Sequence, residues 1–217
     1  MKLLITGGLG FIGRTLAEAL LHNTDYEIHI VDIRDFPKEL CSSHISFHKT
    51  DVCDIGALQR IFEEEKFDGV IHLAAVSRVE DAENDKEKCV RINYGGTKNI
   101  VECVAQSDNT WLIFGSSRDV YGEQKIMPVT ETAELCPLNI YGHTKLEGEM
   151  LTQTLRKYMI LRFSNVYGNS YDRPERVIPV FIRNAIAGEP LILHGGEQVI
   201  DFTFIDDTVD IITKCIE

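Results

Sequence analysis

The sequence predicts an α/β fold in which a doubly wound parallel sheet carries helices on both faces. Three observations lead to this prediction. Short apolar runs alternate with longer segments of helical periodicity, a glycine-rich turn follows the first apolar run, and Asp32 closes the second run. Because parallel strands need a crossover connection, which is usually a helix, this alternation favours a parallel sheet over hairpins.

The predicted elements follow one another along most of the chain. Apolar runs mark six strands, at residues 2–6, 27–31, 45–48, 70–73, 111–116 and 159–164. Helical patterns mark a helix after the glycine turn and further helices at 55–65, 87–106 and 140–155. We therefore expect a Rossmann-type, dinucleotide-binding domain over residues 1–168.

The pattern changes after residue 168. Residues 169–176 are polar and contain Pro174, which predicts a loop into a smaller lobe. The lobe is expected to hold a helix near 178–187, short strands near Leu191 and Phe202, and a final helix begun by Asp206 and Asp207. We assign residues 169–217 to a partial, shortened substrate-binding lobe.

Composition narrows the classes of partner. The 217 residues suffice for a sizeable core, and a formal net charge of −12 disfavours nucleic acid, whose phosphates repel an acidic protein. No apolar stretch approaches the roughly 18 residues of a membrane helix, and the chain enters its first strand without room for a targeting peptide. The six cysteines are scattered without metal-ligand spacing, so we expect reduced thiols, no metal site and a cytoplasmic location.

The first strand-to-helix turn reads Gly7-Gly8-Leu9-Gly10-Phe11-Ile12-Gly13. Gly7 and Gly10 allow the backbone to approach a pyrophosphate, Gly13 allows the helix to pack closely on the strand, and the helix N-terminus presents free N–H groups to the anion. Asp32 follows at about the spacing (~20 residues) at which a carboxylate binds the adenosine ribose. The turn therefore predicts a dinucleotide site that prefers NAD, because Asp32 would repel a 2′-phosphate, although Arg34 argues for NADP.

Two polar groups are expected near this site. Tyr141 and Lys145 stand four residues apart in a helical segment, so they share one helical face. A nearby cation lowers the pKa of a phenol from its usual value of about 10, which would make Tyr141 a usable base. Ser116 and Ser117 end a strand, where doubly wound sheets bind ligands. Each group alone is typical of surface side chains or turn caps, but with the glycine turn they indicate a catalytic site.

Further motifs occur in a fixed order along the chain: Asp51-Val52, His72-Leu73-Ala74-Ala75, Asn93 with Gly96-Thr97, Ser116-Ser117 with Val120-Tyr121-Gly122, Tyr141 with Lys145, and the stretches 161–168 and 201–207. The ordered set resembles the extended short-chain dehydrogenase/reductase family, and in particular its NAD-dependent nucleotide-sugar epimerase and dehydratase branch, which includes proteins similar to UDP-glucose 4-epimerase.

The resemblance implies a role for each matching residue. The expected cofactor contacts are Gly7, Gly10, Phe11, Ile12 and Gly13 at the pyrophosphate, Asp32 at the adenosine ribose, Asp51 and Val52 at the adenine, Leu73, Ala74 and Ala75 along the cleft, Lys145 at the nicotinamide ribose and Phe163 to Val166 near the nicotinamide, with Ile33, Asn93, Ser116 and Tyr141 completing the set.

The resemblance also implies the catalytic residues, Ser117, Tyr141 and Lys145. Ser117 and Tyr141 would hydrogen-bond the reacting sugar hydroxyl, and Tyr141 would remove its proton. The expected substrate contacts are Ser77, Ser117, Asn165 and Arg118.

The chain also departs from the family pattern. Dehydratases of the family carry an Asp-Glu pair after the hydroxyl residue, where this chain has Arg118 and Asp119. A guanidinium cannot serve as that general acid, which disfavours dehydration, whereas Asp119 keeps a carboxylate where related decarboxylases have Glu. Many epimerases have an arginine for the substrate phosphate where this chain has Ile200, and the candidate replacements are Arg118, Arg173, Arg176 and His194.

These observations favour an NAD-dependent epimerase of a nucleotide sugar. The alternatives are an NAD-dependent reductase, dehydrogenase or decarboxylase of the same family, or a dinucleotide-binding regulatory protein with impaired catalysis. Because family members usually extend well beyond this length, we expect part of the substrate lobe to be absent or shortened. A homodimer through the helices at 87–106 and 140–155 is expected from the family, although their apolar residues suit a core equally well: Val90, Ile100, Val101, Val104, Leu146 and Met150.

Overall fold

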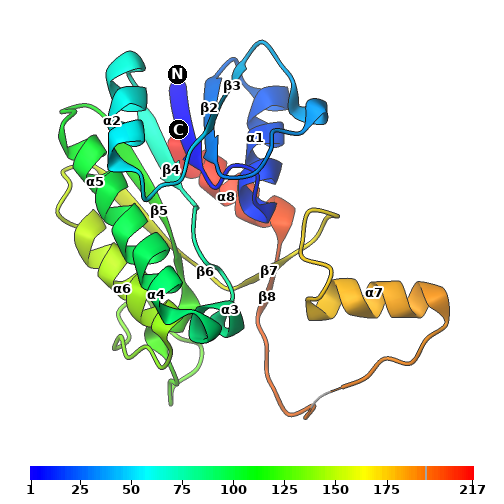
Figure 1. The fold of residues 1–217 in the computed structure, drawn as a ribbon. Helices are drawn as coiled ribbons and strands as arrows, with labels where there is room; N and C mark the ends of the chain where they lie inside the picture. The colour runs from blue at the N-terminus through cyan, green and yellow to red at the C-terminus, as the bar shows by residue number, and fades with distance from the viewer. Residues whose placement is uncertain (194) are drawn as a thin grey trace.

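The computed structural model describes residues 1–193 and 195–217, and within them it shows a six-stranded sheet whose neighbouring strands are all parallel (Figure 1). The strand order is β3-β2-β1-β4-β5-β6, so the sheet grows from β1 in one direction and then from β4 in the other. The reversal opens a crevice at the carboxyl ends of β1 and β4, where sheets of this type bind ligands. The strands are β1 (Lys2–Thr6), β2 (Glu27–Asp32), β3 (Ile45–Lys49), β4 (Gly69–His72), β5 (Trp111–Ser117) and β6 (Tyr158–Phe163).

Helices connect the strands and cover both faces of the sheet (Figure 1). A π-helix at Val90–Gly96 joins α4 to α5, and short 3₁₀ turns lie at Lys38–Leu40 and Arg118–Tyr121. The α-helices are α1 (Phe11–Asn23), α2 (Ile55–Glu64), α3 (Val79–Asn84), α4 (Lys86–Cys89), α5 (Thr97–Ala105), α6 (Ile140–Thr152), α7 (Val177–Ala187) and α8 (Ile205–Ile216).

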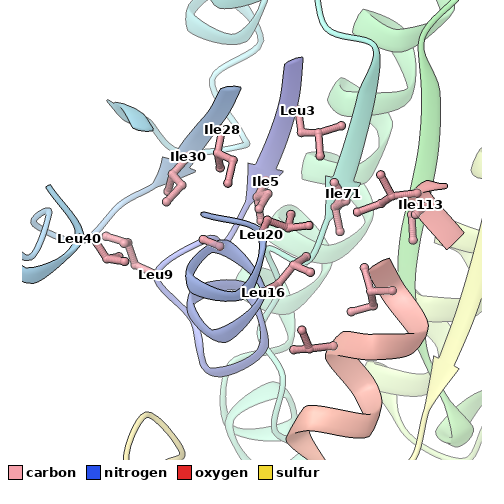
Figure 2. Packing of buried hydrophobic residues seen from close by; sticks show 14 of the residues in the cluster. Leu3, Ile5, Leu9, Leu16, Leu20, Ile28, Ile30, Leu40, Ile71 and Ile113 are labelled. Atoms are coloured by element: carbon pink, nitrogen blue, oxygen red, sulfur yellow. The ribbon is translucent and has the colours of Figure 1, made fainter. Parts of the chain in front are cut away.

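The two faces of the sheet are buried separately, because successive side chains of a strand point in opposite directions. Leu3 and Ile5 of β1 pack with Leu16 and Leu20 of α1, and isoleucines of β2, β4 and β5 join the same cluster (Figure 2). Residues of α8, among them Ile212, complete it. Leu4, which lies between Leu3 and Ile5 in β1, belongs to the cluster on the other face of the sheet, which α2 and α5 cover.

Helix α6 lies unusually close to β5. A Cβ atom at Gly148 would lie 2.6 Å from Cζ of Phe114, which is closer than real Cβ contacts. Glycine at this position therefore sets the distance between α6 and the sheet, and this matters because α6 carries Tyr141 and Lys145.

The structure confirms the predicted fold class, and all six expected strands are present within about a residue of their predicted ends. The helix expected at 87–106 is divided into α4, the π-helix and α5, and α3 is an element that the sequence did not indicate. Residues 188–193 and 195–201 form no strand, so the strand expected near Leu191 was wrong. The strand near Phe202 is present as β8 (Phe202–Phe204) and pairs in parallel with β7 (Asn165–Tyr167).

The segment after Gly168 divides between two surroundings. Helix α7 and the residues that follow it project away from the sheet, and within the described residues α7 buries none of its side chains (Figure 1). Helix α8 instead returns to the sheet and packs against α1. The domain boundary at residue 168 remains a prediction, and the first domain's core is completed by a helix that lies beyond it in sequence.

Across the described ranges, the model contains no helix that combines the length and the apolar character needed to cross a bilayer.

We expect Ile212→Ala to lower the free energy of unfolding by about 2–5 kcal/mol, because the side chain of Ile212 is fully buried between α8 and the sheet and its loss leaves a cavity. The matched control is Ile211→Ala, at a neighbouring position that is 50% exposed, where we expect a change below about 0.5 kcal/mol. Urea unfolding of both variants measures the difference. Equal effects would contradict the packing of α8 against the sheet.

Candidate active site

A cleft of about 860 Å³ lies at the carboxyl edge of the sheet. Turns after β1, β2, β4 and β5 form its wall, together with the first turns of α1 and α6. Of the expected site residues, the following line this cleft: Gly7, Gly10, Phe11, Ile12, Gly13, Asp32, Ile33, Asp51, Val52, Leu73, Ala74, Ala75, Ser77, Ser116, Ser117, Arg118, Tyr141, Lys145, Phe163, Asn165 and Val166.

The glycine turn has the close backbone packing that a dinucleotide cradle needs. Gly7 has a φ of +67°, and a Cβ there would lie 2.7 Å from the backbone N of Ala74. A Cβ at Gly13 would lie 2.4 Å from the carbonyl O of Gly7. Among the described residues no side chain caps the start of α1 at Gly10, so its first N–H groups are left to meet an anion.

Asp32 presents a fixed carboxylate at the end of β2. Its Oδ2 accepts a hydrogen bond from the backbone N–H of Leu9 at 3.0 Å, and its Oδ1 accepts one from the N–H of Arg34 at 3.1 Å. The Arg34 guanidinium donates to the carbonyl O of Leu9 at 2.8 Å. The carboxylate thus connects the glycine turn to β2. It also lies in the cleft wall, where it can accept hydrogen bonds from the hydroxyl groups of a ribose.

Tyr141 and Lys145 lie on the first two turns of α6, which Asn139 caps by accepting a hydrogen bond from the N–H of Gly142 at 2.7 Å. The Lys145 ammonium donates to the carbonyl O of Gly115 in β5 at 2.6 Å and lies 5.9 Å from the centroid of the Tyr141 ring. Ser117, at the end of β5, donates to Asp119 Oδ2 at 2.8 Å. The three expected catalytic side chains therefore face one cleft.

Burial is the largest influence on the pKa values of Tyr141 and Lys145. Desolvation raises the pKa of Tyr141 to about 12, although a hydrogen bond with Ser117 acts in the opposite direction. Desolvation lowers the pKa of Lys145 to about 8. The sequence predicted that Lys145 would lower the pKa of the Tyr141 phenol. In the structure the Lys145 ammonium is instead hydrogen-bonded to the carbonyl O of Gly115, and burial has the largest effect on the pKa of Tyr141.

Two charged neighbours of the expected catalytic residues, Glu149 and Arg162, were not among the residues that the sequence indicated. Glu149, one turn beyond Lys145, is buried and forms a salt bridge of 2.7 Å with Arg162 of β6. Ser116 donates to the same carboxylate at 2.5 Å, so its hydroxyl serves the α6 to β5 connection. The i, i+4 spacing of Lys145 and Glu149, together with Arg162 inside a family motif, was the available signal.

Asn93 lies behind the cleft wall rather than in it. Its side-chain amide exchanges two hydrogen bonds with the backbone of Val76, at 2.8 and 3.2 Å, and also donates to Thr144 Oγ1 at 3.1 Å. The π-helix that carries Asn93 therefore holds the loop after β4 in place. Its expected contact with the cofactor stays a prediction.

Three of the cations that could replace an arginine at position 200 border the cleft. Arg118 is exposed, Arg173 pairs with Asp81 at 2.8 Å, and Arg176 pairs with Asp172 at 3.0 Å. Ile200 and Arg176 both line a side cavity of about 130 Å³ that adjoins the cleft. The remaining candidate cation, His194, lies outside the described residues.

One group of metal-ligand type lies at the opposite end of the sheet. Glu27, His29 and Glu65 converge there, with ligand atoms within 4.8 Å of one another. The Lys2 ammonium lies 3.1 Å from Glu27 and 2.5 Å from Glu65, so it forms ion pairs with both carboxylates.

Comparison with known proteins agrees with this geometry. Residues 3–217 match the model of the NAD dependent epimerase/dehydratase family. The dTDP-glucose 4,6-dehydratase of Haemophilus influenzae is 30% identical over 96% of this chain and 69% of its own length, and the chain spans about two thirds of the curated relatives that it matches. The UDP-glucose 4-epimerase of Thermotoga maritima, solved with UDP-glucose, superposes with a TM-score of 0.91 at 28% identity over 100% of this chain and 74% of that one. The UDP-glucuronic acid 4-epimerase of Bacillus cereus, solved with UDP-glucuronic acid and NAD, gives 0.87 at 30% identity, over 100% and 73%.

We expect Lys145→Met to stabilise the protein by on the order of 2 kcal/mol near pH 7, because it removes an ammonium whose pKa burial lowers from 10.5 to about 8. Below about pH 8 the folded and unfolded states are both protonated and the penalty is complete. Between about pH 8 and 10.5 the unfolded state binds more protons, so wild-type stability rises with pH and the difference shrinks. Urea unfolding at both ends of this range checks it.

The matched control is Lys98→Met on α5, where the lysine is exposed and no comparable stabilisation is expected. A wild type that is more stable than Lys145→Met near pH 7 would contradict the desolvation of Lys145.

Proposed function

Because the chain belongs to the NAD dependent epimerase/dehydratase family, within the extended short-chain dehydrogenases/reductases, and uses NAD, we propose that it is an epimerase of a nucleotide sugar. The observation that carries the proposal is that Ser117, Tyr141 and Lys145 face one cleft while Arg118 stands where a dehydratase needs a carboxylic acid. Structural relatives at 28–30% identity are epimerases of UDP-sugars, which supports a nucleotide-sugar substrate.

Each residue has a distinct task in the proposed reaction. Ser117 Oγ orients a sugar hydroxyl, and Tyr141 removes its proton and later returns one, so the substrate passes through a ketone. Lys145 holds the nicotinamide ribose and stabilises the phenolate, while Asp32 and the glycine turn hold the adenosine half. When bound, NAD supplies the hydride acceptor and, after the sugar has turned, the hydride donor. The close turn at Gly7 and Gly13, the free start of α1 and the Asp32 carboxylate fit this cofactor.

Substrate contacts are proposed around the open end of the cleft. Asn165 and Ser77 line the cleft near the catalytic residues, and Arg118 and Arg176 supply positive charge for a diphosphate where Ile200 does not. An acidic protein with a net charge of −12 needs such a local cluster to bind an anionic sugar nucleotide.

A second candidate activity is dehydration or decarboxylation. The curated relatives include dTDP-glucose 4,6-dehydratases, and Asp119 places one carboxylate beside Ser117. Arg118 argues against dehydration, because that reaction uses an acid and a base side by side. The masses of the products separate the candidates, since an epimer keeps the mass of its substrate and the others lose water or carbon dioxide.

We expect Tyr141→Phe to reduce turnover by at least about 10²-fold and to leave NAD binding nearly unchanged, because the ring keeps its packing and only the proton acceptor is lost. Turnover is measured by NMR with UDP-glucose and dTDP-glucose supplied separately, and NAD binding by calorimetry. The control is Tyr158→Phe on β6, where the tyrosine is 44% exposed and no change is expected. Wild-type turnover by Tyr141→Phe would contradict the role of Tyr141 as the base, whereas NAD binding by the wild type without turnover of either sugar nucleotide would favour the regulatory alternative.

The protein is further proposed to be a cytoplasmic homodimer through residues 87–106, which include the π-helix and α5, and residues 140–155, which include α6. Ile100, Val101 and Val104 are buried within the protomer, so the interface would rest on the exposed Val90 and Met150. We expect a dimer mass by light scattering at micromolar concentration and a shift to monomer in Met150→Glu. A monomer mass for the wild type would contradict the proposal.

A further inference from the structure

Residues 169–176, between β7 and α7, run along the open side of the cleft and contact helices on both of its banks. On the α1 side, the Asn169 side-chain amide donates to Thr15 Oγ1 at 2.9 Å. The Tyr171 hydroxyl donates to Glu18 Oε1 at 2.9 Å, and the Arg14 guanidinium lies over the Tyr171 ring, 4.0 Å from its centroid.

On the α3 side, the same segment is held by ion pairs. Arg173 Nη1 lies 2.8 Å from Asp81 Oδ2, and Glu175 Oε1 lies 3.3 Å from Nη1 of Arg78, the residue that precedes α3. Between the two attachments, Asp172 accepts hydrogen bonds from its neighbour's backbone N–H at 2.8 Å and from Arg176 at 3.0 Å, which fixes the turn of the segment.

The topology places this segment across the path of a dinucleotide. Helix α1 follows β1 and α3 follows β4, and these two strands are neighbours in the middle of the sheet. Asp32 lies at the end of β2 on one side of them, and Lys145 is bound to β5 on the other. A ligand that reaches from Asp32 to Lys145 must pass the ends of β1 and β4, where Tyr171, Asp172 and Arg173 line the same cleft.

The two attachments differ in strength. The α1 attachment includes hydrogen bonds and an aromatic contact, whereas the α3 attachment consists of ion pairs whose side chains are between 31% and 46% exposed. Exposed ion pairs are individually weak and are screened by salt. The segment is therefore expected to release more readily at α3 than at α1.

We propose that residues 169–176 form a strap that closes over the bound dinucleotide and retains it, and that the strap opens at its α3 end. A retained cofactor suits a reaction that regenerates NAD in each cycle, but the inference depends on NAD binding alone and not on the proposed reaction. The strap thus assigns Arg78, Asp81, Arg173 and Glu175 to cofactor retention.

The test measures release of NADH from the loaded protein, followed by the loss of its fluorescence after mixing with excess NAD. We expect Asp81→Asn to release NADH about two- to fivefold faster than wild type, as the loss of one exposed ion pair implies. At about 0.5 M NaCl the wild-type rate should approach that of the variant, because salt screens the ion pair between Arg173 and Asp81 that the variant lacks. The matched control is Asp108→Asn, which breaks an exposed pair with Arg156 far from the cleft.

Asp81→Asn separates the strap from simple electrostatics. Removing a negative charge near an anionic ligand would by itself slow release, so only the loss of the attachment accelerates it. The strap also predicts that association accelerates together with dissociation, and that the double variant Asp81→Arg with Arg173→Asp restores slow release. Release from Asp81→Asn at or below the wild-type rate would overturn the proposal, as would an unchanged association rate or failure of the double variant to slow release.

Discussion

The arrangement of the candidate site depends on one buried ion pair, Glu149 with Arg162. It joins α6 to β6, and Ser116 adds β5 to the same carboxylate. Tyr141, Lys145 and Glu149 occupy successive turns of one helical face, so anchoring the third turn fixes the height and rotation of the first two. Loss of Arg162 would leave the buried Glu149 carboxylate without a counter-charge, which is strongly destabilising. The close contact at Gly148 brings the helix near enough for these bonds to form.

The surroundings of Lys145 show how the site tolerates a buried ammonium. His72, at the end of β4, is fully buried and hydrogen-bonded to Thr6 and Thr97, and desolvation lowers its pKa to about 3. It therefore stays neutral and adds no second positive charge next to Lys145. This histidine belongs to a motif that was identified in the sequence. As a neutral side chain it connects β4 to β1 and to α5 through hydrogen bonds.

The sequence was sufficient for the sheet because burial on both faces gives each strand a nearly continuous apolar run. The strand prediction near Leu191 was wrong because burial is absent there. Leu191 to Leu193 are apolar but exposed, and such a run does not form a strand without a neighbouring strand to pair with. Many of the residues that line the cleft were identifiable from motifs because they sit at turns that follow strands, whereas Tyr141 and Lys145 were identifiable from their spacing on one helix. The direction of the Tyr141 pKa was not, since burial depends on packing that spacing does not reveal. Glu149 and Arg162 were missed because their partnership joins a helix to a strand.

The packing of α8 against α1 has a consequence for the order of folding. Residues near position 16 complete their apolar surroundings only with residues near position 212, so α1 cannot finish its packing until a helix much later in the sequence has been made. Such long sequence separation slows folding, because the entropy of closing the loop is lost before the contact forms. During synthesis, the α2 and α5 face of the sheet can assemble first, and the α1 face stays exposed until α8 is made.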